Sequence, residues 1–315
     1  MEFLGIDIGG TKCAVVRGNE KGQVIEKIKF PTTDVNETLE NIFSAAEKIK
    51  GNSAAVGISC GGPLDSETGT ILSPPNLPGW DRIEIVKAVR KRLGLKAYLC
   101  NDANACALAE WRFGAGRGSR NMIFLTFGTG MGAGLILDGK LYNGANGNAG
   151  EVGHIRMEKF GPSGYGKQGS FEGFASGGGI ALSGKMYALE AIQRGEQPLY
   201  CKDLSELETV TAKSVAEAAM QGDKTALKVY ETTGEMLGRG LAILIDIINP
   251  DRIVIGSVYQ RSSKLMENTM YKVIEEEALS HAREAVTIAA AELGDDVGDA
   301  AALALAMECY ERIGD

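Results

Sequence analysis

Short apolar runs, separated by polar and glycine-rich turns, fill the chain up to residue 114. The run FLGIDI at residues 3–8 predicts a buried strand, and KCAVVRG at residues 12–18 predicts a strand that returns after a Gly-Gly turn. Apolar positions at helical spacing, followed by Gly51, predict a helix over residues 36–50. The same patterns predict further strands at residues 24–32, 54–60 and 97–100 and further helices at residues 81–94 and 101–114. Strands that alternate with helices indicate an α/β protein.

The pattern restarts after residue 121. MIFLTF at residues 122–127 predicts a strand, GTGMG a glycine turn, and AGLILDG at residues 133–139 the return strand. This repeat of the N-terminal order predicts two lobes of related design. We expect a small α/β lobe of residues 1–117 plus 299–315, whose last helix packs back on it, and a large α/β lobe of residues 118–298.

Beyond residue 170 the pattern is mostly helical. Residues 225–248 predict one long helix with an apolar face. Gly234, Gly238 and Gly240 weaken such a helix, so we expect another element to pack closely against them.

Composition narrows the classes of function. The 315 residues carry a net charge of −8, which argues against a nucleic-acid partner because phosphate binding needs clustered Lys and Arg. The acid at position 2 and the short apolar runs indicate neither a signal peptide nor a membrane span. The six cysteines form no CxxC pair, which indicates buried, reduced thiols in a cytoplasmic protein.

Two glycine turns predict phosphate binding. In DIGGTK, residues 7–12, a strand ends in an acid and enters a turn whose backbone N–H groups can form a concave anion site. Thr11 adds a hydroxyl donor, and Asp7 can hold Mg²⁺ through water. The turn GTGMG, residues 128–132, repeats this chemistry in the second lobe. Taken alone either turn can be a plain hairpin, but the pair indicates that one polyphosphate is held from both sides.

The segment CNDANA, residues 100–105, supplies a candidate base. Asp102 stands where a strand passes into a helix, in the position of an N-cap, and a carboxylate suffices as the base in phosphoryl transfer. Asn101 offers a donor and an acceptor that suit a vicinal diol. Two more loops, PPNLPGW with Asn76 and EVGH with Glu151 and His154, carry groups that suit sugar hydroxyls, although each alone is more simply a turn.

Together these motifs resemble the ROK family of sugar kinases over nearly the whole chain. The resemblance rests on DIGGTK, PPNLPGW, NDANA, FGTGMGAGLILDGKLYNGANGNAGEVGH, the segment 161–172 and NPDRIVIG. It implies a two-lobed actin-like ATPase fold, related to ribonuclease H, with a mixed sheet flanked by helices in each lobe and the active site in the cleft between the lobes. It also implies ATP and Mg²⁺ as cofactors, and a homodimer or homotetramer whose interface comes from the second lobe.

The resemblance assigns roles to individual residues. Asp102 is the expected base, and Asp7 the expected Mg²⁺ residue. The expected sugar ligands are Gly62, Asn76, Asn101, Glu151, His154 and Glu172, with Gly61 nearby. The expected ATP contacts are Gly9, Gly10, Thr11, Lys12, Thr129, Gly130 and Gly256, with the helix region 234–240 beside the adenine.

Two departures from the family pattern matter. The family carries a zinc knuckle with a histidine as fourth ligand, but its cysteine positions correspond here to Ser163, Tyr165 and Ser170. Neutral hydroxyls are poor zinc ligands, so we expect no zinc, His154 as a sugar ligand only, and a loop held by hydrogen bonds and by packing of Tyr165 and Phe171. Where the family shows a run of glycines near the adenine, this chain has Ser257 and Val258, which leaves the nucleotide preference open.

The leading hypothesis is therefore an ATP-dependent hexokinase that acts on glucose. Kinases for fructose, mannose, N-acetylmannosamine or N-acetylglucosamine are alternatives, because these sugars differ by few hydroxyl contacts. A non-catalytic sugar sensor is a further alternative. A repressor of the same family is not expected, since the first phosphate turn begins at residue 7 and leaves no room for a DNA-binding segment before it.

Overall fold

The computed structural model describes residues 1–314 and divides the chain into two compact units. Unit 1 contains Met1–Ser119, Gly134–Ala149 and the chain from Glu292 onward, and unit 2 contains Arg120–Ala133 and Gly150–Ala291. The first division lies beside the boundary predicted at residues 118–121. Residues 134–149, which we placed in the large lobe, are grouped with unit 1, because Gly134 lies against Ala107 of the same unit.

A five-stranded mixed sheet forms the centre of unit 1, with strand order β3-β2-β1-β4-β7. Strands β1 and β2 are the predicted hairpin around the first glycine turn, and β1, β4 and β7 run parallel. The strands are β1 (Glu2–Ile8), β2 (Lys12–Asn19), β3 (Val24–Pro31), β4 (Val56–Cys60) and β7 (Ala97–Asn101). A separate small hairpin consists of β5 (Leu64–Asp65) and β6 (Thr70–Ile71).

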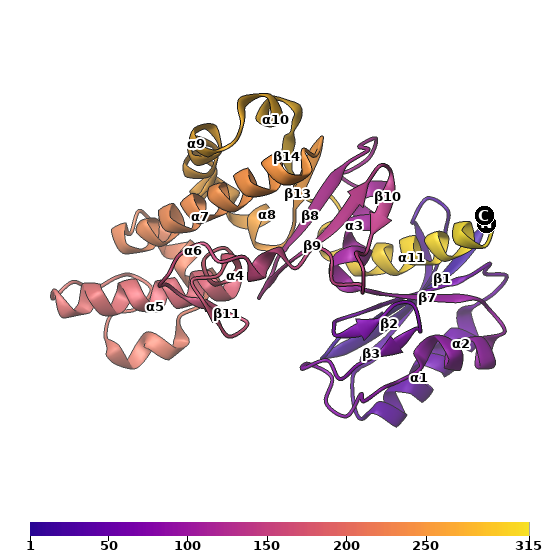
Figure 1. Ribbon diagram of the computed structural model, residues 1–315. Coiled ribbons are helices and arrows are strands. Elements are labelled where there is room, and N and C mark those ends of the chain that lie inside the picture. Colours follow the sequence, from indigo (N-terminus) through magenta and orange to yellow (C-terminus); the bar gives the residue numbers. More distant parts are fainter. Residues whose placement is uncertain (315) are drawn as a thin grey trace. The chain divides into compact units, whose positions relative to one another are not determined.

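Helices cover both faces of this sheet. Helices α1 (Val35–Ile49) and α2 (Ile85–Leu93) bury their apolar faces with Ile6, Val15 and Ile58 in one core. On the other face lie α3 (Asp102–Phe113) and α11 (Val297–Gly314), which contact each other and β4 (Figure 1). The C-terminal helix therefore packs on the first unit, as predicted.

Strand β9 (Met131–Leu137) begins in unit 2 and continues into unit 1, where it pairs with β10 (Lys140–Tyr142). In unit 2, β8 (Met122–Phe127) precedes the second glycine turn and pairs in parallel with β13 (Arg252–Ile255), which pairs with β14 (Thr287–Ala290). The repeat of strand, glycine turn and strand is therefore present in the structure.

Helices make up most of the rest of unit 2, as predicted. They are α4 (Phe171–Phe174), α5 (Gly177–Gln193), α6 (Ala212–Met220), α7 (Lys224–Ile248), α8 (Val258–Ser262), α9 (Glu267–Glu277) and α10 (Ser280–Ala285). The short elements are η1 (Val152–His154), β11 (Ser163–Gly164), β12 (Lys167–Gln168), η2 (Leu204–Thr209), η3 (Ser263–Leu265) and, in unit 1, η4 (Gly294–Asp296). No helix among residues 1–314 combines the length and apolar character needed to cross a membrane.

The contacts of the long helix α7 explain why it contains three glycines. Carbonyl oxygens of Met266 and Met270 lie 2.7 Å from the places that a Cβ would take at Gly234 and Gly238, and the Phe171 ring lies 2.3 Å from that place at Gly240. Helix α9 can therefore approach the α7 backbone directly (Figure 1). The Phe171 ring approaches it at Gly240. The close packing that we expected is present, and these three α-carbons face protein.

Candidate active site

The first glycine turn, residues 9–12, is closed by its own backbone. The Gly9 N–H donates to the Lys12 carbonyl at 3.1 Å, and the Thr32 hydroxyl donates to the Gly9 carbonyl at 2.6 Å. The N–H groups of Gly10 and Thr11 have no acceptor within the described chain. Two adjacent free donors, with exposed Lys12 beside them, are the groups that an anion site of the predicted kind needs.

The loop that carries Asn76 packs against this turn. A Cβ on Gly10 would lie 2.7 Å from the Asn76 carbonyl oxygen, so only glycine allows this close approach. Leu77 and Trp80, each 1% exposed, anchor the loop in the core and leave Asn76 exposed. A Cβ on Gly61 would lie 3.5 Å from the Asn76 amide nitrogen, and one on Gly62 would meet open space. Unit 1 thus brings Asn76, Gly61 and the phosphate turn together.

Asp7 is the last residue but one of strand β1, two positions before the turn. Burial, with the negative charges of Asp299 and Asp102, raises the pKa of the Asp7 carboxyl to about 6, against the opposing effect of Lys27 and Lys12. Asp299 is buried and pairs with Lys27. The structure gives the Asp7 carboxylate no hydrogen-bond donor in the described residues, so its oxygens can accept from the water shell of a cation.

The helix start at Asp102 differs from the prediction. Asn101, not Asp102, is the N-cap of α3, because it ends β7 in an extended conformation and its Oδ1 accepts from the Asn104 N–H at 2.8 Å. The cap occupies the Asn101 oxygen and leaves its amide nitrogen available to donate. Asp102 is instead the first helical residue, and its Oδ1 accepts from the Ala103 N–H at 2.8 Å.

Asp102 is exposed as a residue. Desolvation by the protein around its carboxyl nevertheless raises the pKa of that group, and the hydrogen bond from Ala103 opposes the shift. A base with a raised pKa takes a proton more readily than an ordinary aspartate.

The second glycine turn, residues 128–131 in unit 2, is closed by a hydrogen bond from the Gly128 N–H to the Gly130 carbonyl at 3.1 Å. The first turn of α5 also holds it, since Gly177 N–H donates to the Gly128 carbonyl at 2.7 Å and Gly178 N–H to the Thr129 carbonyl at 3.0 Å. The N–H groups of Thr129 and Gly130 find no acceptor among residues 1–314. The second turn therefore presents the same pair of free donors as the first.

Glu172, which is itself a predicted sugar ligand, is hydrogen-bonded to the second turn. Its Oε2 accepts from the Met131 N–H at 2.8 Å, and a Cβ on Gly130 would lie 2.5 Å from the same oxygen. One carboxylate oxygen is thus fixed against the turn, and the other can accept from a ligand. Glu172 itself stands in the first turn of α4.

Glu151 and His154 are placed by a short helical turn on β9. Gly150 accepts from the Ala133 N–H at 2.8 Å, and Gly153 lies directly on the Met131 carbonyl. Both side chains are exposed on this turn. Lys167 donates to the His154 carbonyl at 2.5 Å, while the structure gives the imidazole no partner in the part of the chain that it describes.

The loop 161–172 folds around one serine. Ser170, which is 0% exposed, accepts from the N–H groups of Gly164 and Gly173 at 3.2 and 3.1 Å and caps α4. Phe171 is buried against α7, as predicted. The predicted packing of Tyr165 is wrong, because its ring is 80% exposed at the hairpin tip. Ser163 is exposed too, so the hydroxyls do not converge on one point.

The segment after β13 borders the second turn. The Gly256 N–H donates to the Leu125 carbonyl at 3.0 Å, and a Cβ on Gly128 would lie 3.9 Å from the Ser257 hydroxyl. Ser257 has a φ of 56°, a conformation that favours glycine. The Val258 side chain lies next to Gly177.

Each unit thus assembles its own predicted residues. Unit 1 gathers Asp7, the 9–12 turn and Asn76, and its Asn101 and Asp102 start α3. Unit 2 gathers the 128–131 turn, Glu151, His154 and Glu172. Sequence reasoning missed the two N–H groups of α5 that hold the second turn. The glycine run SGGG at residues 176–179 was the available signal, because three glycines at a helix start indicate a close backbone neighbour.

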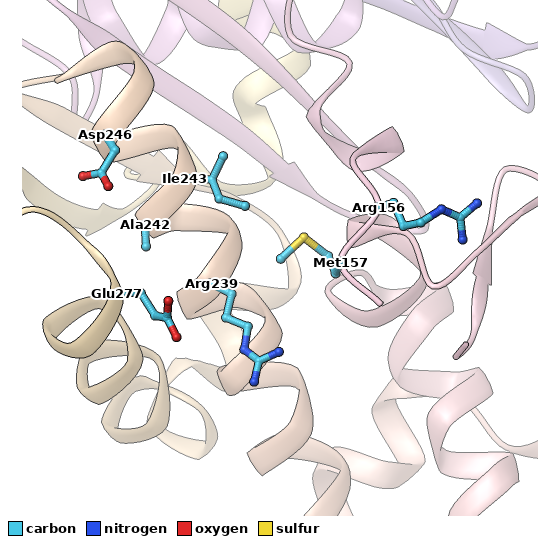
Figure 2. A pocket seen from close by; sticks show the side chains of 7 residues that line it. All are labelled: Arg156, Met157, Arg239, Ala242, Ile243, Asp246 and Glu277. Carbon is cyan, nitrogen blue, oxygen red and sulfur yellow. The ribbon is translucent and has the colours of Figure 1, made fainter. Parts of the chain in front are cut away.

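One cavity of unit 2, of about 210 Å³, lies elsewhere (Figure 2). It is lined by Arg156, Met157, Arg239, Ala242, Ile243, Asp246 and Glu277. Arg239 already pairs with Glu158 and Glu235, and Asp246 accepts from the Leu279 N–H. Arg239 lies in the helix region 234–240 that we expected beside the adenine, but none of the residues predicted individually for catalysis, sugar or phosphate lines this cavity. It is therefore not the candidate active site.

Comparison with known proteins identifies the family to which the whole chain is similar. A sequence profile of the ROK family matches residues 3–309. A glucokinase of Thermotoga maritima is 32% identical over 320 residues, which cover 100% of this chain and 99% of that protein. The crystal structure of a ROK family glucokinase from Streptomyces griseus, in complex with glucose and AMPPNP, is 31% identical with a TM-score of 0.77, covering 98% of this chain and 100% of that one. The ROK hexokinase from Thermus thermophilus is 28% identical with a TM-score of 0.83, covering 99% and 100%.

Proposed function

This chain belongs to the ROK family, and from that premise we propose that it transfers the γ-phosphoryl group of ATP to a hydroxyl of glucose, with Asp102 as general base. The family and its glucokinase members make the chain an ATP-dependent sugar kinase with the two-lobed actin-like ATPase fold. The observation that carries the proposal is the pair of free backbone donors in each glycine turn, because four such N–H groups suit the oxygens of a polyphosphate.

Asp102 takes the proton of the attacking hydroxyl in this proposal. Its raised pKa favours acceptance of that proton, and its place in the first turn of α3 holds it rigidly. The transition state of phosphoryl transfer is loose, so positioning and charge neutralisation supply most of the acceleration. Gly9, Gly10, Thr11 and Lys12 would then hold the phosphates from unit 1, and Thr129 and Gly130 from unit 2.

Sugar hydroxyls would be held by amides, acids and one imidazole. Asn101 can donate through its amide nitrogen, while its oxygen accepts from the Asn104 N–H in the cap of α3. Asn76 offers both a donor and an acceptor, and Gly61–Gly62 lie beside it. In unit 2, Glu172 offers one free carboxylate oxygen, and the exposed side chains of Glu151 and His154 complete the set.

Mg²⁺ would be held by Asp7 through water. The residue fits this role because its carboxylate has no donor in the described chain and stands beside the free N–H pair of the first turn. The ion would neutralise charge on the β- and γ-phosphate oxygens. For the nucleotide, Gly256 remains the proposed adenine contact, and Ser257 and Val258 leave the base preference open.

A zinc ion does not fit the loop 161–172, so we propose that the protein holds none. The Ser170 hydroxyl is already engaged with two backbone N–H groups, and Ser163 and Tyr165 are exposed. Within residues 1–314, no three His, Cys, Asp or Glu side chains gather into a cluster fit for a metal. Metal analysis that finds one zinc per chain in purified protein would overturn this point.

The central experiment is an ADP-release assay over a panel of glucose, fructose, mannose, N-acetylmannosamine and N-acetylglucosamine. We expect glucose to give the highest kcat/KM. Asp102→Asn should lower kcat by about 1,000-fold or more while glucose still binds in calorimetry. Asp65→Asn is the matched control, because its oxygen can still accept from the Glu67 and Thr68 N–H groups of a surface turn. Turnover of another sugar would reassign the substrate, and binding without any turnover would favour a sensor.

We also propose a cytoplasmic homodimer or homotetramer. The use of ATP supports the location. Exposed apolar side chains on unit 2 support an interface there, namely Leu182, Met186, Leu189, Ile247 and Leu279. Light scattering coupled to gel filtration should give a mass of two or four chains, and a monomer at micromolar concentration would exclude this assembly.

A further inference from the structure

Glu110 is a buried carboxylate without an assigned role. It lies near the end of α3, is 0% exposed, and accepts from three backbone N–H groups. Its Oε2 accepts from Ala115 at 2.8 Å and Glu292 at 3.2 Å, and its Oε1 accepts from Leu293 at 2.9 Å. Both oxygens are therefore used. The sequence gives no hint of this role, because Glu110 reads as one polar position in an amphipathic helix.

The two segments that Glu110 holds are connections between the two units. Residues 114–119 lead to the division at Ser119, where the chain leaves unit 1, and Glu292 is the residue at which it returns. The Trp111 indole N–H, one residue beyond Glu110, donates to the Ser119 carbonyl at 2.8 Å. The end of α3 therefore fastens both of these connections inside unit 1.

The start of α3 is fastened to the other two connections. A Cβ on Gly134 would lie 2.5 Å from the Ala107 Cβ and 2.7 Å from the Ala103 carbonyl oxygen. The Asn104 amide donates to Asn143 at 3.1 Å, and Asn143 accepts from the Ala149 N–H at 3.1 Å. Gly134 and Ala149 are the unit 1 residues at the remaining divisions. All four connections thus attach, on the unit 1 side, to the helix that starts at Asp102.

We propose that Glu110 is a positioning residue for Asp102, since it locks the far end of α3 to the connections at Ser119 and Glu292. This inference rests on the proposed role of Asp102 in sugar phosphorylation. Helix α3 has 12 residues, so it is about 18 Å long and moves as one rod. Unpaired N–H groups at one end would shift or tilt that rod, and misplacement of a base by about 1 Å can cost on the order of 100-fold in rate.

Glu110→Gln tests this with little change in shape. The amide keeps one acceptor oxygen but turns an NH₂ group towards a backbone N–H that needs an acceptor. Glu311→Gln is the matched control, because Glu311 also links α3 to a neighbouring segment, through Arg112, but its side chain is half exposed. We expect kcat to fall about tenfold or more in Glu110→Gln, with KM for glucose within about threefold, and no such change in the control.

A double-mutant cycle separates positioning from a general loss of structure. If Glu110 acts through Asp102, then Glu110→Gln in the Asp102→Asn background should lower the residual kcat by less than about twofold. The decrease in melting temperature should be the same in both backgrounds. A full tenfold loss in the Asp102→Asn background would overturn the inference, although the wild type would still be a sugar kinase.

Amide hydrogen exchange gives a second reading that needs no turnover. In Glu110→Gln we expect faster exchange at Ala103 and Asn104, at the start of α3, as well as at Ala115, Glu292 and Leu293. Changes confined to the last three sites would show that Glu110 acts only locally and would overturn the inference. If the wild type phosphorylates no sugar, the proposed function fails, and the exchange at Ala103 and Asn104 still decides whether Glu110 positions this helix.

Discussion

The two glycine turns, residues 9–12 in unit 1 and 128–131 in unit 2, leave the same groups free but are supported by different chemistry. Each turn has two consecutive N–H groups without an acceptor in the described chain. The first turn stands beside charge, with Asp7 before it and Lys12 within it. The second has Thr126 in the place that corresponds to Asp7, and the N–H groups of α5 hold its carbonyls.

Each turn also packs against a proposed sugar ligand of its own unit. Gly10 lies against the Asn76 carbonyl, which is backbone, and Gly130 lies against the Glu172 carboxylate, which ends a flexible side chain. The difference teaches that the same pair of free N–H groups, proposed here to bind phosphate, can be built with or without a neighbouring ionisable group. The first turn has charged side chains beside it, whereas the second offers only fixed backbone donors. Substitutions at matching positions should therefore have unequal effects.

The largest contrast should come from Asp7 and Thr126, which stand two positions before their turns. Asp7→Asn should lower kcat/KM by about 100-fold or more, since it removes the proposed Mg²⁺ residue. Thr126→Val, at the matching position, removes no charge. It removes the hydrogen bonds of the Thr126 hydroxyl with the Gly132 N–H at 2.9 Å and the Gly132 carbonyl at 3.3 Å, and should cost about threefold. Steady-state assays at saturating Mg²⁺ measure both. Equal losses would remove the distinction between a charged and an uncharged turn.

Matching alanine substitutions should show the difference in stiffness. Gly10→Ala places a Cβ 2.7 Å from a backbone oxygen, so the turn or the Asn76 loop must move, and kcat/KM should fall about 30-fold or more. Gly130→Ala meets only the Glu172 carboxylate, which can rotate away, so we expect about a fivefold loss, mainly as a raised KM for the sugar. The opposite ranking would contradict the structural account of the turns.

Asp7 should also make stability depend on pH. The carboxyl has a pKa of 3.8 in the unfolded chain and about 6 in the folded protein, so between these values the folded state holds the extra proton and the free energy of unfolding falls as pH rises. Above about pH 6 the whole penalty is present.

Asp7→Asn should therefore raise the free energy of unfolding by on the order of 2–3 kcal/mol at pH 7.5, and the gain should vanish below about pH 4. Denaturant titrations at both pH values measure it. Thr126→Val, which removes no titrating group, should shift stability equally at both. A gain for Asp7→Asn that persists at the lower pH would exclude this explanation.

The smallest effect should come from Ser257, beside the second turn. Its φ of 56° is strained for serine, and the hydrogen bond from its N–H to Gln260 at 3.0 Å belongs to the backbone and survives in glycine. Ser257→Gly should raise the free energy of unfolding by about 1 kcal/mol, or about 1–2 °C in Tm. Ser59→Gly, in an extended strand, is the control and should destabilise. A destabilised Ser257→Gly would show that the serine side chain contributes more than the strain costs.

The sequence predicted the strands, the long helices and both turns well, because local apolar periodicity and glycine placement carry that information. It could not assign the N-cap of α3 correctly, since Asn101 and Asp102 are both good caps and only the extended backbone at the end of β7 selects the first. Nor could it place residues 134–149, whose grouping with unit 1 depends on contacts with α3 that are distant in sequence.

For the candidate site, the sequence pattern predicted which residues take part but not which residues hydrogen-bond to them. The contact between Glu172 and Met131 joins residues 41 apart, and the Glu110 contact with Leu293 joins residues 183 apart. No periodicity encodes such pairs. Tyr165 shows the opposite error, because an aromatic residue in a glycine-rich loop suggested packing, and the hairpin instead projects it into solvent.

The hydroxyl of Ser170 has a consequence for the conditions under which the enzyme can work. A thiolate knuckle depends on the supply of a trace metal and is open to oxidation, whereas a serine hydroxyl hydrogen-bonded to two backbone N–H groups is affected by neither. The loop before Glu172 is therefore fastened by groups that the chain always carries. Such a kinase would keep its proposed sugar-binding residues in place in zinc-starved or oxidatively stressed cells.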